Sequence, residues 1–241
     1  VNPMKIEQIT VTRFRHTTNQ VKDTDGHSHP GPVSETSSAL LQIICDDGTT
    51  GQVVSGLGDV EEPILDKFVR PNLLGQDPLR IEKLWHALYK WQRGSGAKLT
   101  DRVLCAVDLA LWDLMGKAAG QPVWRLLGGY NDSILAYGST MCGDDMEGGL
   151  ATPEDYARFA EWMVGTRGYK AIKLHGWMPP IPGAPSVKKD YAACAAVREA
   201  VGPDIPLMLD PNHWYSRTDS LWLCQRLAEL DFLWIEEMME E

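Results

Sequence analysis

The sequence predicts an α/β protein in which a small α+β domain precedes a parallel sheet built from β/α units. A pattern of strands, a hairpin and helices ends near residue 129, and short apolar strands alternate with amphipathic helices from residue 130 onward. Because no glycine-rich phosphate-binding turn follows these strands, a β/α barrel is favoured over an open doubly wound sheet. We therefore expect domains at 1–129 and 130–241, the second holding about the first four strands of an eight-stranded barrel.

The first domain is expected to contain a small antiparallel sheet followed by helices. An Asp-Gly turn at Asp47-Gly48 predicts a hairpin between the second and third strands. Polar residues fill the connection between the first two strands, 16–37, and a compact domain seldom carries so long an unstructured segment unless it is a lid or binding loop. We therefore predict a lid there. The expected strands are 4–14, 39–45 and 51–54, and the expected helices lie near 61–73, 78–91 and 101–119.

Charge, hydropathy and cysteine content narrow the function classes. The 241 residues carry a formal net charge of -10 and no Lys/Arg cluster, which argues against a nucleic-acid partner. No apolar run reaches the roughly 18 residues of a membrane-spanning helix, and the polar start lacks the apolar core of a secretion signal. The five cysteines have no CxxC spacing, which favours buried free thiols over disulfides or a zinc site. A cytoplasmic protein without a membrane partner is expected.

Ionisable residues stand at the ends of three strands expected in the second domain. Lys173 and His175 end one strand, Asp210 ends the next and Glu236 ends the last. The carboxyl ends of barrel strands open onto one face, so these side chains are expected to converge. Lys173 and His175 are two residues apart and should point to the same side of their strand. The expected strands are 134–139, 171–175, 206–210 and 232–236, and the expected helices lie near 153–165, 187–201 and 218–229.

These residue types favour proton abstraction assisted by a metal ion. Asp210 and Glu236 offer hard carboxylate oxygens, which indicates Mg²⁺, with Mn²⁺ as the alternative. A lysine and a histidine beside such a metal suit removal of a proton alpha to a carboxylate, because positive charge stabilises the enediolate while a neutral base takes the proton. Each signal alone also has a structural explanation, such as a turn at Asp210-Pro211-Asn212 or a solvated charge run from Glu236 to Glu241. Their joint occurrence favours a site.

With these residues in this order, the chain resembles the enolase superfamily and, within it, the mandelate racemase subgroup, which includes many acid-sugar dehydratases. Sites of this superfamily use a Lys or His base with Mg²⁺. The resemblance implies an N-terminal capping domain, whose long loop closes the site, and a modified β/α barrel. It covers nearly the whole chain and rests on DLALWDLMGKAAGQPVWRLLGG (108–129), YKAIKLH (169–175), LMLDPN (207–212) and WIEEM (234–238).

The resemblance also implies roles for single residues. Asp210 and Glu236 match the first two of three Mg²⁺ ligands, and Lys173 matches the first lysine of the family's KxK motif. Asn212 matches the polar residue that follows the first ligand. His175 stands where the second lysine, often the acid/base, usually lies. This departure leaves three alternatives: the base is His175, it is Lys173, or it is a group further along the chain.

The family's third ligand and a frequent His-Asp pair come from later strands, whereas this sequence ends at Glu241, just after the fourth expected strand. We therefore expect a fragment of a longer polypeptide; the alternative is that a second chain supplies the remainder. His27, His29 and the many hydroxyl-bearing residues of the expected lid can form hydrogen bonds, which favours a polyhydroxy acid over an aromatic substrate such as mandelate. The expected substrate-binding residues are His27, His29, Trp177, Asn212 and His213.

The leading hypothesis is a Mg²⁺-dependent acid-sugar dehydratase, a hydro-lyase that removes the proton alpha to a carboxylate and then expels the β-hydroxyl. A racemase, epimerase or cycloisomerase of the same superfamily shares the first half of this reaction and is the main alternative. A second alternative is a non-catalytic barrel that serves as a scaffold or binding protein, which the histidine at position 175 and the early end both motivate. The expected partner is a small-molecule carboxylate substrate, an acid sugar. The protein is also expected to form a homo-oligomer.

Overall fold

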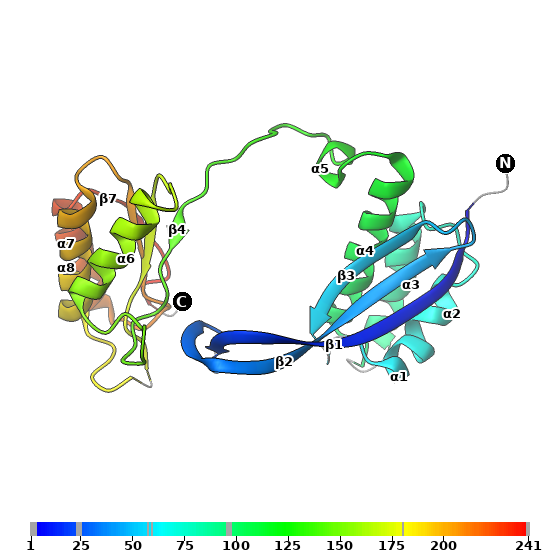
Figure 1. The fold of residues 1–241 in the computed structure, drawn as a ribbon, viewed down its shortest axis with the longest axis horizontal. Coiled ribbons are helices and arrows are strands. Elements are labelled where there is room, and N and C mark those ends of the chain that lie inside the picture. The colour runs from blue at the N-terminus through cyan, green and yellow to red at the C-terminus, as the bar shows by residue number, and fades with distance from the viewer. Residues whose placement is uncertain are drawn as a thin grey trace. The chain divides into compact units, whose positions relative to one another are not determined.

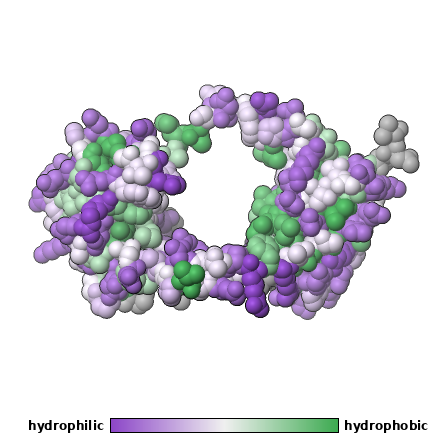
Figure 2. All heavy atoms as spheres, viewed as in Figure 1, coloured by the Kyte–Doolittle hydropathy of each residue, from purple (hydrophilic) through white to green (hydrophobic). Residues whose placement is uncertain are grey.

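The chain folds into two compact units, each with its own apolar core. The first unit comprises Val1–Thr18 and Ser34–Asp132, and the second comprises Asn19–Val33 and Ser133–Glu241. Figure 2 shows that hydrophilic residues dominate the visible surface of both units. The structure, a computed structural model, describes residues 4–22, 26–56, 58, 60–94, 98–179 and 181–239.

The first unit contains a three-stranded sheet in the order β1-β2-β3 (Figure 1). The predicted hairpin between its second and third strands is confirmed, because they pair antiparallel with Leu41 opposite Val53. Gly48 adopts a φ of 85° in the connecting turn, a conformation that glycine reaches without strain. The strands are β1 (Ile6–Lys22), β2 (Ser28–Cys45) and β3 (Thr50–Gly56).

The expectation of an unstructured segment at 16–37 is wrong for most of its length. β1 continues to Lys22 and β2 begins at Ser28, so the two strands form a long hairpin through this polar stretch (Figure 1). Most of its residues are exposed, so no apolar alternation marks the strands in the sequence. Hydrogen bonds between the two strands satisfy their backbone groups, although, in its described residues, neither face of this hairpin packs on a core. Residues 23–25 lie outside the described part of the chain.

The helices of the first unit follow the predicted pattern. The longest, α4, starts at a Thr100 cap that accepts a hydrogen bond from the Val103 N–H and ends at Gly120 in the left-handed conformation. Its apolar face packs on β3, and Gly51 of β3 lies so close to the Ala110 carbonyl that a side chain would collide with it. The elements are α1 (Glu62–Ile64), the π-helical turn η2 (Leu65–Val69), α2 (Arg70–Leu73), α3 (Ile81–Gly94), α4 (Asp101–Ala119) and α5 (Val123–Leu126).

The second unit contains four parallel strands in the order β4-β5-β6-β7, with a helix in each connection. This is the topology of the first part of a β/α barrel, and it confirms the predicted fold class. Each connecting helix starts at a Ser or Thr cap. The elements are β4 (Gly138–Ser139), α6 (Pro153–Gly165), β5 (Ile172–His175), α7 (Val187–Val201), β6 (Leu207–Asp210), α8 (Arg217–Glu229) and β7 (Phe232–Ile235).

The first strand of this unit is shorter than the predicted 134–139. Gly138 pairs with Ile172, the first residue of β5, so residues before Gly138 have no partner in that strand. Ile134 and Leu135 are accordingly 85% and 93% exposed. Their apolar character produced the incorrect start of the predicted strand, since apolarity alone does not supply a pairing partner.

Candidate active site

The two faces of the parallel sheet separate core residues from candidate functional residues. Ile172 and Leu174 of β5 belong to the apolar core that α6, α7 and α8 share. Because side chains alternate along a strand, Lys173 and His175 lie on the opposite face. The register places Lys173 beside Met208 and His175 beside Asp210, so Asp210 shares that face.

Four of the predicted site residues come together at the carboxyl ends of β5, β6 and β7. Lys173 Nζ lies 2.9 Å from Asp210 Oδ2 and also forms an ion pair with the Glu236 carboxylate. His175 Nδ1 lies 3.7 Å from the same Asp210 oxygen. Glu236 is anchored by its backbone N–H, which donates to the Leu209 carbonyl over 3.0 Å. One ammonium, two carboxylates and one imidazole therefore share a single site.

The surroundings give the two basic groups opposite protonation preferences. Burial opposes the charge of Lys173, but hydrogen bonds to Glu236 and Asp210 outweigh it and raise the pKa of the ammonium. Burial lowers the pKa of His175, and the neighbouring Asp210 only partly offsets this effect. His175 Nδ1 is buried and has no hydrogen-bond partner among the described residues. The surroundings thus favour the charged form of Lys173 and the neutral form of His175, and a neutral imidazole can accept a proton.

The carboxylates of Asp210 and Glu236 could hold a divalent cation. Both contact the same Lys173 nitrogen, so their oxygens converge on one point. Hard oxygen donors of this kind fit Mg²⁺, which commonly binds through one or two carboxylates and completes its shell with water and substrate. Within the described residues, no group of three or more His, Cys, Asp or Glu side chains is arranged for a metal.

Asn212 and His213, two and three residues after Asp210, take different positions. Asn212 stays beside the site, because its backbone N–H donates to Asp210 Oδ1 over 3.0 Å and its φ of 51° folds the chain into a turn. His213 instead contacts the segment after β7, with Nδ1 3.3 Å from the Met239 carbonyl and Nε2 3.4 Å from Glu237. The turn predicted at Asp210-Pro211-Asn212 and the site therefore coexist.

The hairpin between β1 and β2 brings two predicted histidines into the second unit. The ring of His27 lies 6.4 Å from that of His175, centroid to centroid. His29 is only 7% exposed, and its Nδ1 lies 3.0 Å from Asp144 Oδ2. His29 and Asp144 also line a cavity of about 210 Å³ with Met146 and Met178.

Trp177 was expected to form a wall of the substrate pocket, but it belongs to the core. Its side chain is 2% exposed and packs 4.8 Å from the Tyr156 ring, with Lys189 Nζ 4.0 Å above its own ring. Its backbone N–H donates to Asp190 over 3.1 Å. The loop after β5 turns the indole inward, an orientation that residue type and position in the sequence do not reveal.

Several buried polar residues near the site were absent from the sequence-based prediction. Asp144, the partner of His29, follows β4 by five residues and resembles any loop aspartate in the sequence. Thr140 and Tyr156 contact the backbone of His175, and Asp190 contacts that of Trp177. The position of Thr140 directly after a predicted strand was the one available signal.

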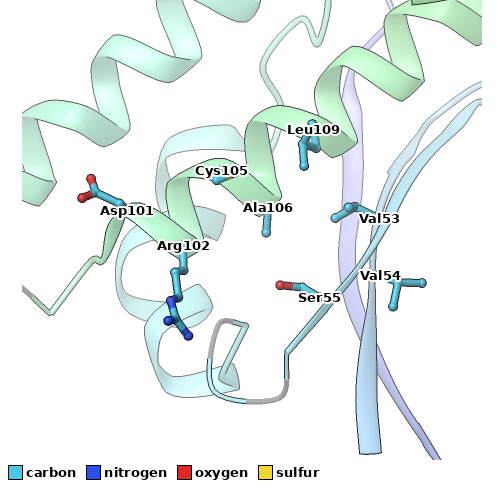
Figure 3. Close-up of a pocket in the computed structure, with 8 residues that line it drawn as sticks. All are labelled: Val53, Val54, Ser55, Asp101, Arg102, Cys105, Ala106 and Leu109. Atoms are coloured by element: carbon cyan, nitrogen blue, oxygen red, sulfur yellow. The ribbon is translucent and has the colours of Figure 1, made fainter. Parts of the chain in front are cut away.

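Another pocket, of about 380 Å³, lies in the first unit between β3 and the start of α4 (Figure 3). Half of its lining residues are apolar, namely Val53, Val54, Ala106 and Leu109, and its ionisable members are Asp101, Arg102 and Cys105. It lacks the pairing of a buried cation and a neutral base found around Lys173. The candidate active site is therefore in the second unit.

A parallel sheet that carries ionisable residues at the carboxyl ends of its strands has the arrangement of a β/α-barrel active site. Comparison with known families matches residues 9–128 to the N-terminal domain of mandelate racemase/muconate lactonizing enzyme and residues 155–241 to the enolase C-terminal domain-like family. The chain therefore belongs to the mandelate racemase/muconate lactonizing enzyme family of the enolase superfamily. This confirms the resemblance seen in the sequence.

The relatives include dehydratases and cycloisomerases. The chain is 34% identical to D-galactarolactone cycloisomerase of Agrobacterium fabrum over 82% of its own length and 50% of the relative's. It is 31% identical to L-talarate/galactarate dehydratase of Salmonella typhimurium over 87% of its length and 50% of the relative's. The crystal structure of D-glucarate dehydratase from Agrobacterium tumefaciens complexed with magnesium superposes with a TM-score of 0.90 and 56% identity, covering 98% of this chain and 61% of that one. The chain thus spans about half the length of the curated relatives it matches.

Among the described residues, none of the helices is both long and apolar enough to cross a membrane. All five cysteines are free thiols, and Cys45, Cys142 and Cys194 are buried.

Proposed function

We propose that this protein is a Mg²⁺-dependent acid-sugar dehydratase. The observation that carries the proposal is the convergence of the Asp210 and Glu236 carboxylates on the Lys173 ammonium, with the imidazole of His175 beside Asp210. Two carboxylates, a cation and a neutral base are the groups needed to take a proton alpha to a carboxylate. The relatives named as galactarate, arabinonate and glucarate dehydratases support this choice.

In this proposal Asp210 and Glu236 hold Mg²⁺, which when bound would stabilise negative charge developing on the substrate carboxylate. Lys173 adds a second positive charge, because its ion pairs keep it protonated. His175 takes the alpha proton, since burial keeps its imidazole neutral. The β-hydroxyl then leaves as water, because the protonated His175 donates to it the proton that it took from the alpha carbon. This assignment selects His175 over Lys173 as the base.

We propose an acid sugar as the substrate because polar and ionisable groups surround the reacting position. His27 lies beside His175, and Asn212 is held next to Asp210. Several relatives named after sugar acids support this substrate class. We also propose that the protein forms a homo-oligomer, as members of the family often do, and that it is cytoplasmic. The net charge of -10 supports the absence of a nucleic-acid partner.

A cycloisomerase is the second candidate, favoured by relatives named D-galactarolactone cycloisomerase and 3,6-anhydro-alpha-L-galactonate cycloisomerase at 34% and 33% identity. Both reactions can begin with the same proton abstraction, so the site residues do not distinguish them. The fate of the bond at the β carbon does.

Product analysis by NMR tests the proposal. The purified protein is incubated with Mg²⁺ and a panel of galactarate, talarate, glucarate, galactonate and arabinonate. A dehydratase yields a 2-keto-3-deoxy acid, whereas a cycloisomerase gives a ring-opened or ring-closed isomer and an epimerase a stereoisomer. Asp210→Asn should lose turnover by at least about 100-fold, and the exposed control Asp204→Asn should keep it. Full Mg²⁺-dependent turnover in Asp210→Asn would refute the proposal.

A further inference from the structure

The main chain of His175 lacks strand partners on the side facing β4. Ser139, the last residue of β4, pairs with Lys173, so the ladder ends two residues before His175. In a parallel ladder, residues two apart direct their N–H and C=O groups to the same side. The backbone groups of His175 on this side therefore need other partners, since buried backbone groups are nearly always hydrogen-bonded.

Thr140 supplies the first of these partners. Its backbone N–H donates to the Lys173 carbonyl over 2.8 Å, and its hydroxyl Oγ1 accepts from the His175 N–H over 2.9 Å. Thr140 is 5% exposed, so little water competes for these bonds. One residue thus holds the backbone of both basic groups of the site.

Tyr156 of α6 supplies the second partner. Its side chain is completely buried, and its hydroxyl donates to the His175 carbonyl. Burial raises the pKa of Tyr156 well above its ordinary value, so the hydroxyl keeps the proton that it donates. The two peptide groups that flank the His175 Cα are therefore each held by a side-chain hydroxyl.

The turn after His175 is fixed by a separate set of contacts. Asp190 accepts hydrogen bonds from the Trp177 N–H, over 3.1 Å, and from the Tyr215 hydroxyl. A side chain at Gly176 would overlap the Asp190 carboxylate, so the backbone lies directly against it. The chain is consequently fixed on both sides of His175.

We propose that Thr140 and Tyr156 are positioning residues that set the location of the His175 imidazole. Because Nδ1 of that ring has no hydrogen-bond partner among the residues described, the backbone provides much of the ring's placement. Small displacements of a reacting group lower the rate of chemistry strongly while leaving substrate binding nearly intact. The catalytic consequence rests on the proposed function of His175; the structural consequence does not.

Variants that remove only a hydroxyl test the proposal. Thr140→Val removes the acceptor at constant shape, Thr140→Ser restores it, and Tyr156→Phe removes the second hydroxyl. Tyr191→Phe is the matched control, because Tyr191 lies in the same unit and packs edge-on against Trp222. The ring ¹H–¹⁵N NMR signals of His175, assigned with His175→Gln, report the imidazole's surroundings without any need for turnover. Steady-state kinetics on the same variants separate kcat from KM.

We expect Thr140→Val and Tyr156→Phe to shift the His175 ring signals and to lower kcat by about 10- to 100-fold with KM changed by less than about 3-fold. Thr140→Ser and Tyr191→Phe should match the wild type in both readouts. A folded Thr140→Val or Tyr156→Phe with wild-type ring signals, or with wild-type kcat in an active enzyme, would overturn the proposal. Shifted signals together with an inactive wild type would uphold the positioning role and refute the proposed function. If Tyr156→Phe does not fold, the comparison of Thr140→Val with Thr140→Ser decides whether the proposal holds.

Discussion

The Lys173 ammonium affects the site both without and with a bound metal ion. It forms ion pairs with both Asp210 and Glu236 and lies where their oxygens converge. A divalent cation bound by the same carboxylates would lie near this positive charge and be repelled by it. Under the proposed function, the lysine would weaken metal binding while providing the positive charge that stabilises the enediolate.

Replacing this lysine should accordingly separate binding from turnover. We expect Lys173→Met to bind Mg²⁺ about 10-fold more tightly, since a nearby like charge is removed, and to lose turnover by about 100-fold or more. Titration calorimetry and a product assay measure the two effects. The exposed control Lys170→Met should change neither. Unchanged affinity and turnover in Lys173→Met would show that the ammonium is not part of the site.

Asp190 should make stability depend on pH. Burial raises the pKa of this carboxyl to about 6, whereas in the unfolded chain it ionises near the ordinary value of about 3.9. Between these values the folded state holds a proton that the unfolded state has released. The contribution of Asp190 to the free energy of unfolding should therefore fall as pH rises from about 4 to about 6, by on the order of 3 kcal/mol, and then level off.

Chemical denaturation across this pH range measures the effect. Asp190→Asn keeps the shape of the side chain and removes its titration, so its unfolding free energy should lack this decrease. Asp204→Asn, at an exposed position, should retain the wild-type profile. An identical pH profile in the wild type and Asp190→Asn would contradict the assignment.

At the scale of elements, a buried pair from distant parts of the sequence joins the start of β2 to the loop after β4. His29 and Asp144 are 115 positions apart, and their side chains are 8% and 1% exposed. Asp144 also accepts from the Met146 N–H over 3.0 Å, so the loop after β4 is built around its carboxylate. Removing one member of such a pair removes a buried polar interaction of the other, which is costly in a buried site.

Asp144→Ala should therefore loosen the start of β2. We expect backbone amides in residues 26–33 to exchange with deuterium about 10- to 100-fold faster, while the core strand β6 keeps its protection. Asp145→Ala removes the neighbouring, exposed carboxylate and should leave exchange unchanged. Hydrogen exchange followed by mass spectrometry measures both. Equal exchange in the two variants would mean that the pair does not hold the hairpin.

The elements also show where sequence patterns suffice. The helices from α6 to α8 and the strands from β5 to β7 were predictable because apolar periodicity and Ser or Thr caps agree there. The end of β1 and the start of β2, within residues 16–37, were not predictable as strand. Both faces of this hairpin are largely exposed and carry no apolar alternation. The shortened β4 depends on the register with β5, which is a property of two segments together.

At the scale of the whole molecule, the convergence of Lys173, His175, Asp210 and Glu236 followed from topology alone, because parallel strands end at one edge of a sheet. The hydrogen bonds that hold the backbone of His175 did not follow from the topology. Thr140 and Tyr156 reach His175 from positions 35 and 19 residues away, and their roles depend on exact distances between packed elements. The assignment of domains to 1–129 and 130–241, like the role of each site residue, stays a prediction.

The proposed function depends on removal of the proton alpha to the carboxylate of an acid sugar. Exchange of the alpha proton tests the proposed chemistry before any later step decides the product. The purified protein is incubated in D₂O with an acid sugar, with and without Mg²⁺, and the alpha position is followed by ¹H NMR. We predict deuterium incorporation or substrate loss that requires Mg²⁺ and disappears in His175→Gln. Exchange that persists in His175→Gln, or no reaction with any acid sugar in the presence of Mg²⁺, would contradict the account.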